Sequence, residues 1–147
     1  MPTKAEQIAD LEVAYVQFRD LFSMLPDDWF QRAGLGDWTL AELLAHMAGW
    51  YRALAVDLTA VAIGGEAHPR GYYEPEDEWN ARFTTEARTG TAALDDFDMA
   101  FHEFYAALKA LNDDTYGPDG FGSRALQGVG LKHFEEHHAA IDAWVQR

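Results

Sequence analysis

Residues 131–144 read Leu-Lys-His-Phe-Glu-Glu-His-His-Ala-Ala-Ile-Asp-Ala-Trp and place two histidines four positions apart. Because an α-helix turns once in about 3.6 residues, His133 and His137 lie one above the other on one helix face. Ile141 and Trp144 continue this face with apolar side chains, so we expect both imidazoles to point toward the core. A buried polar ring needs a partner, and two inward rings at this spacing can aim nitrogen atoms at one metal ion. The stretch therefore predicts a metal site, for which the rest of the chain supplies a third ligand.

The histidine pair also has simpler interpretations. A His-x-x-x-His pair arises often by chance in helices, and both residues are then polar members of the core. His138 lies about 100° around the helix from His137, where it is a rim or surface residue or a reserve ligand. Glu135 and Glu136 are expected to form a solvated face. They do not fit the His-Glu-x-x-His order of metalloproteases, because no glutamate directly follows His133.

The composition limits the class of protein. The chain has 147 residues, the length of one ordinary domain, so we expect residues 1–147 to form a single domain. The absence of cysteine excludes disulfides and a thiolate nucleophile and agrees with a reducing cytoplasm. We find no signal peptide, and charged residues interrupt the most apolar long stretch, residues 43–63. The net charge of −14 disfavours binding to phosphate backbones. These features predict a cytoplasmic protein that binds neither membranes nor nucleic acids.

Apolar residues recur at helical spacing along the chain. Thr3 with Glu6 and Thr39 with Glu42 have the spacing of capping boxes, which mark helix starts. No segment shows the period-two alternation of a strand, so the fold class is all-α. The pattern predicts helices over residues 4–25, 40–63, 91–111 and from a Ser123 cap to the C-terminus, with a short extra helix that begins at Glu76 and is ended by Gly90.

Four principal helices in one domain predict a four-helix bundle. The connection between the second and third helices, residues 63–91, is long and carries the short extra helix. This length indicates a crossover, so the bundle need not have a simple up-down-up-down topology.

Three further histidines lie before the last helix. His46 is on the shoulder of the apolar stripe of the second helix, and taken alone it is either a satisfied interfacial histidine or a ligand. His68 lies in a predicted loop, and His102 lies on the outer face of the third helix, so both are expected to be ordinary polar residues.

Three segments resemble the DinB/YfiT-like superfamily. Residues 38–50, Trp-Thr-Leu-Ala-Glu-Leu-Leu-Ala-His-Met-Ala-Gly-Trp, resemble its second-helix signature, and residues 133–137 resemble its last-helix signature. Residues 77–82, Asp-Glu-Trp-Asn-Ala-Arg, look like the segment after the crossover in one branch of the superfamily. That branch includes mycothiol-dependent maleylpyruvate isomerase and ClbS/DfsB-like proteins. The resemblance covers nearly the whole chain and implies a DinB-like bundle whose metal is bound by three histidines.

Carried over position by position, the resemblance implies the ligands His46, His133 and His137. Three neutral imidazoles leave an open position on a divalent ion for water or substrate, and imidazole suits both zinc and nickel. Asn80 either orients the water or substrate at the metal or only forms a hydrogen bond across the crossover. Glu42 lies one turn before His46, where it either accepts a hydrogen bond from that ring or only caps its helix.

Three functions are possible, of which the resemblance favours the first. The first is a metal-dependent transferase or hydrolase, in which a low-molecular-weight thiol or a water attacks a small-molecule electrophile and Asn80 is catalytic. The second is a non-catalytic, metal-binding, stress-related protein, and the third is a metal-free interaction domain with core histidines. A homodimer is implied for each. The sequence shows no signature of a thiol-cofactor pocket and no counterpart of the isomerase's C-terminal domain, so the isomerase reaction is not carried over.

Overall fold

The computed structural model describes all residues 1–147, which are helical apart from connections and one isolated β-bridge between Leu35 and Trp38. The α-helices are α1 (Lys4–Asp20), α2 (Leu40–Ala62), α3 (Glu76–Thr85), α4 (Thr91–Ala110), α5 (Phe121–Ala125) and α6 (His133–Val145). The connections contain the short 3-10 helices η1 (Asp27–Gln31), η2 (Arg70–Tyr73) and η3 (Asp113–Tyr116). A π-helix, η4 (Leu126–Lys132), joins α5 to α6.

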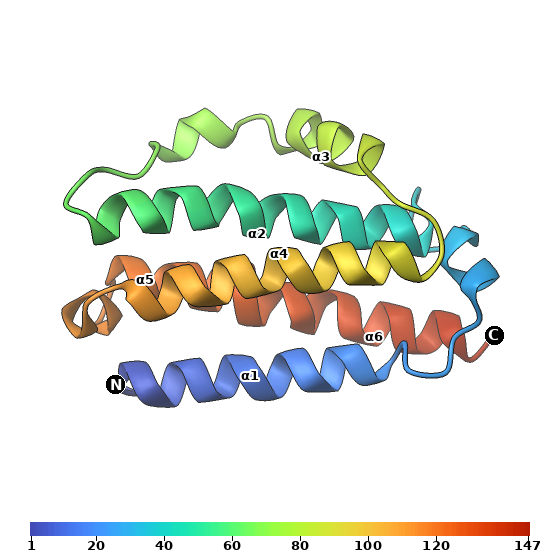
Figure 1. Cartoon of the computed structure of the whole chain (residues 1–147), viewed down its shortest axis with the longest axis horizontal. Coiled ribbons are helices and arrows are strands. Elements are labelled where there is room, and N and C mark those ends of the chain that lie inside the picture. The colour runs from blue at the N-terminus through green and yellow to red at the C-terminus, as the bar shows by residue number, and fades with distance from the viewer.

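Four long helical segments lie side by side and form the predicted bundle (Figure 1). α1, α2 and α4 are three of them, and α5, η4 and α6 form the fourth without a break. α2 and α4 run in the same direction, while α1 and the fourth segment run in the opposite direction. α3 lies outside α2, within the connection that returns the chain to the start of α4. The predicted all-α fold and its crossover are therefore confirmed. No helix combines the length with the apolar composition that crossing a lipid bilayer requires.

Both predicted capping boxes are present and fix the starts of α1 and α2. The backbone N–H groups of Glu6 and Glu42 each donate to the hydroxyl of the capping threonine at 3.1 Å. Glu42 Oε1 in turn accepts the backbone N–H of Thr39 at 3.0 Å. These bonds satisfy backbone donors that have no partner within the helix.

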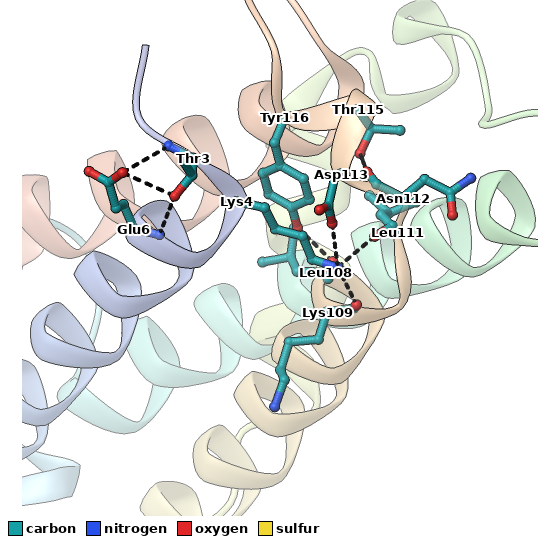
Figure 2. Close-up of polar contacts among 10 residues, drawn as sticks. All are labelled: Thr3, Lys4, Glu6, Leu108, Lys109, Leu111, Asn112, Asp113, Thr115 and Tyr116. Carbon is teal, nitrogen blue, oxygen red and sulfur yellow. Dashed lines mark hydrogen bonds and ion pairs between the residues drawn. The ribbon is translucent and has the colours of Figure 1, made fainter.

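The C-terminal end of α4 is held by a lysine from α1. Lys4 Nζ donates to the carbonyls of Lys109 and Leu111, at 2.7 Å each (Figure 2). The hydroxyl of Tyr116 donates to the carbonyl of Leu108 at 2.6 Å. The last carbonyls of a helix lack intrahelical partners, so these bonds satisfy them and attach α1 to α4.

Two predicted helix ends were wrong. α1 ends at Asp20, not near Leu25, because the N–H groups of Leu21 and Phe22 bond to carbonyls three residues back instead of four. α3 ends at Thr85, well before Gly90. Gly90 instead precedes α4 with a φ of 55°, a left-handed conformation that favours glycine.

The predicted Ser123 cap was also wrong. The last helical segment begins earlier, at Phe121, after Gly120 and without a side-chain cap. Ser123 is buried inside α5, where its hydroxyl donates to Oε1 of the fully buried Gln7 at 2.9 Å. The sequence around Ser123 does not reveal that its partner is Gln7, because Gln7 lies on α1.

Candidate metal centre

The structure brings together the three histidines named as ligands. His46 comes from α2, and His133 and His137 come from the first turns of α6. One ring nitrogen from each histidine lies within 4.8 Å of the others, and no cysteine, aspartate or glutamate joins this cluster. The Nε2 atoms of His46 and His133 are 3.0 Å apart. Residues far apart in the sequence therefore form a cluster that can hold a metal ion.

The π-helix η4 leads directly into α6, which begins at His133. Leu126, Gly130 and Phe134 are buried and recur every four residues. This spacing keeps the three residues on the side of the segment that faces the core. Gly130 lets this segment pack closely on α1, because a Cβ atom at this position would lie 2.9 Å from a methyl carbon of Leu11, which would have to move. The π-helix was not predicted from the sequence, because a spacing of four is also typical of an α-helix.

Burial keeps the three imidazoles neutral. It lowers the pKa of His46 to about 4, although the hydrogen bond to Asn80 acts in the opposite direction. Burial and the two neighbouring histidines lower the pKa of His133 to about 3. Burial also lowers the pKa of His137. Neutral imidazoles carry a free lone pair, which is the form that binds a metal.

Two ring nitrogens in the cluster are buried without a hydrogen-bond partner. They are Nε2 of His137 and Nδ1 of His133. The backbone of Val129 partly offsets the low pKa of His133, but Nδ1 of His133 makes no hydrogen bond. Unpaired buried polar atoms are uncommon in native proteins, and a bound ion is one of the interactions that can replace the missing hydrogen bond. The donor set therefore fits a divalent metal that imidazole favours.

Asn80 contacts the cluster from α3. Its Oδ1 lies 2.9 Å from Nδ1 of His46 and accepts the indole N–H of Trp50 at 2.8 Å. The interhelical hydrogen bond considered for Asn80 is thus present. Glu42 makes its capping box, while the outer nitrogen of His46 is paired with Asn80. The hydrogen bond from Trp50 to Asn80 was not predicted from the sequence, because this bond depends on how α3 packs against α2.

The remaining histidines lie outside the cluster. His138 is partly exposed on α6. The exposed His102 donates from Nδ1 to the carbonyl of Asp98 at 2.7 Å. Nδ1 of His68 lies 2.7 Å from the carboxylate of Asp57, which is buried and also accepts the hydroxyl of Tyr73 at 2.6 Å. This last group attaches the crossover to α2.

Comparisons with known proteins agree with this fold. A solved structure of a protein from Streptococcus pneumoniae matches with a TM-score of 0.79 and 14% identity, covering 99% of this chain and 92% of that chain. At this identity the likeness shows the fold alone. No curated protein matches the chain. The model of one family, described as the mycothiol maleylpyruvate isomerase N-terminal domain, matches residues 11–129, a range that includes His46 and Asn80 and ends before His133. Because this match spans most of the sequence, the chain belongs to that DinB-like family.

Proposed function

We propose that His46, His133 and His137 bind one divalent ion, zinc or nickel, and that the protein is a metal-dependent transferase or hydrolase of small molecules. The observation that carries this proposal is the cluster itself. It consists of three neutral imidazoles, one of which has a buried Nε2 without a partner, and it includes no fourth protein ligand. Three protein ligands with an open position are typical of catalytic sites, while structural zinc sites are closed by four.

A divalent ion in this site would act as a Lewis acid that activates a water or a thiol near neutral pH. The residues around the site would determine how strongly the ion activates the water or thiol. All three candidate ligands are uncharged, so they do not cancel the charge of the ion. Trp38, whose ring centroid lies 4.7 Å from that of His46, provides an apolar wall beside the cluster. A partly apolar wall limits water access and strengthens electrostatic effects inside the site.

A low-molecular-weight thiol is the proposed co-substrate. The support is the description of the matching family, which names mycothiol. Asn80 is the proposed catalytic residue, and its geometry limits how it can act. Its Oδ1 is already engaged by Trp50 and His46, so a contact with substrate would come from its amide nitrogen, as a hydrogen-bond donor.

The first test is elemental analysis of the untagged protein purified without added metal, beside the His46→Ala variant. We expect close to one equivalent of zinc or nickel in the wild type and a large loss in the variant. Absence of metal from both proteins, even after supplementation, would contradict the proposal and favour a bundle with core histidines.

The second test separates a catalytic from a structural site. The protein is loaded with Co²⁺, which reports its ligands through its absorption spectrum, and a low-molecular-weight thiol such as mycothiol is added. A new thiolate-to-cobalt band that depends on thiol concentration supports the open position and the thiol. An unchanged spectrum, with a fourth protein ligand revealed by mutation, would favour the alternative of a non-catalytic, metal-binding dimer.

A further inference from the structure

We propose that Trp50 and Asn80 are positioning residues that fix the proton of His46 on Nδ1, so that its Nε2 lone pair already faces the cluster before any metal binds. This inference deepens the proposed metal site, and its functional meaning rests on that site. The proton position itself is a property of the metal-free chain.

The orientation of the Asn80 amide is set by Trp50. An indole N–H is only a donor, and it lies 2.8 Å from Oδ1 of Asn80. If the amide were turned by half a rotation, its NH₂ group would face the indole N–H and two donors would meet. Trp50 therefore selects the orientation in which the oxygen of Asn80 faces both α2 side chains.

The oxygen of Asn80 then determines the tautomer of His46. Nδ1 of His46 lies 2.9 Å from the same Oδ1, which can only accept. A hydrogen bond at this distance requires the proton on Nδ1. Because the buried ring is neutral, it has no second proton, and Nε2 is left with a free lone pair.

A second contact extends this assignment to His133. Nε2 of His46 lies 3.0 Å from Nε2 of His133, a separation at which one nitrogen donates and the other accepts. With a lone pair on His46, the donor in the metal-free protein is Nε2 of His133. Nδ1 of His133 is then the bare nitrogen, and it makes no hydrogen bond.

The two histidines therefore differ in how they would bind zinc. His46 keeps its proton on Nδ1 throughout. To bind through Nε2, His133 must move the hydrogen from Nε2 to its own Nδ1, so that the ring stays neutral. Outer hydrogen bonds of this kind commonly change metal affinity by about 10- to 100-fold when they are removed.

The test is two-bond ¹H–¹⁵N NMR of the full-length protein labelled at histidine, first metal-free and then with zinc. In the metal-free wild type we expect His46 as the Nδ1–H tautomer and His133 as the Nε2–H tautomer. Zinc should remove the Nε2 hydrogen of His133 and leave the Nδ1 hydrogen of His46 in place. Observation of His46 as the Nε2–H tautomer would overturn the proposal.

Trp50→Phe is the informative variant, because Trp50 bonds Asn80 and is not one of the proposed ligands. Without the indole N–H, the Asn80 amide is free to turn and can present its NH₂ group to His46. We expect a mixture of His46 tautomers and roughly 10-fold weaker zinc binding. Trp79→Phe is the matched control. The ring centroids of Trp79 and Trp50 are 6.3 Å apart, but the hydrogen bond to Asn80 comes from Trp50. It should leave the His46 tautomer unchanged.

Asn80→Leu and Asn80→Asp separate positioning from packing. Leucine keeps a similar volume but cannot accept, so the Nδ1–H preference should be lost, whereas aspartate accepts and should restore it. A pure Nδ1–H tautomer in both Trp50→Phe and Asn80→Leu would overturn the assigned roles. If the wild-type tautomers are as expected but zinc does not bind, the tautomer inference stands and the proposed function fails.

Discussion

Two buried polar groups in this bundle are built in opposite ways. One joins α1 to α5 around Gln7, which is fully buried. Its amide nitrogen donates to the carbonyls of Pro2 and Tyr116, and its oxygen accepts the hydroxyl of Ser123. The other is the histidine cluster between α2 and α6, where Nε2 of His137 and Nδ1 of His133 have no partner.

The difference separates a group that the chain satisfies by itself from a group that fits the proposed metal site. Burying a polar group without a hydrogen bond costs roughly 1–3 kcal/mol, so a protein satisfies such groups unless another interaction replaces the bond. The Gln7 group is satisfied by the chain itself and fits a purely structural role, as do the bonds of Lys4 at the nearby end of α4 (Figure 2). The histidine cluster, in contrast, leaves two buried ring nitrogens without a hydrogen-bond partner.

The largest expected effect is the loss of metal from the histidine cluster. His137→Ala removes one of three proposed ligands, so zinc or nickel affinity should fall by roughly 100-fold or more. The metal-free variant should retain its helical fold, because the substitution also removes an unpaired buried nitrogen. Titration with zinc, together with circular dichroism, measures both effects. Undiminished binding would exclude His137 as a ligand.

The satisfied group should show the reverse behaviour. Gln7→Leu keeps the volume but leaves the hydroxyl of Ser123 and the carbonyl of Tyr116 without partners, so the free energy of unfolding should fall by about 2–4 kcal/mol. Metal affinity should stay at the wild-type value, since Gln7 lies outside the cluster. Urea unfolding and zinc titration of the same variant test both statements, and a large loss of metal binding would contradict this separation.

Acid should weaken the metal-free protein through the histidine cluster. The folded-state pKa values of His46 and His133 are about 4 and about 3, below an unfolded value near 6.5. Below about pH 6.5 the unfolded chain therefore binds more protons, and stability falls as the pH decreases toward about 4. At about pH 5 the loss should be about 2 kcal/mol for each histidine.

The pH effect is measured by urea unfolding of the metal-free protein at several pH values. His133→Gln should show a shallower loss of stability with acid than the wild type. Gln7→Leu has no changed titratable group, so its curve should run parallel to that of the wild type. Parallel curves for all three proteins would show that these histidines do not titrate as their burial requires.

The smallest effect is expected at Glu135, which lies on a different face of α6 from His133 and His137. Glu135 is exposed on α6 and belongs to neither buried group. Glu135→Ala should change metal affinity by less than about twofold and the free energy of unfolding by less than about 0.5 kcal/mol. Loss of metal in this variant, measured by elemental analysis, would mean that a different face of α6 forms the site.

Much of this architecture follows from local sequence rules. The capping boxes at Thr3 and Thr39 mark helix starts correctly, because cap and partner lie three residues apart on one chain segment. The pairing of His133 with His137 likewise follows from helical spacing alone. His46 was placed with them only through the family resemblance, and the structure brings the three together.

Local sequence patterns specify the all-α class, the four principal helices and the inward face that carries His133 and His137. Each of these features depends only on residues close together in the chain. Tertiary structure alone decided the π-helix before His133, the buried bond between Ser123 and Gln7, and the contact from Trp50 through Asn80 to His46. The physical reason is that each of these needs a partner from another helix. A hydrogen bond or close packing between helices depends on their relative position, which the periodicity of one helix does not contain.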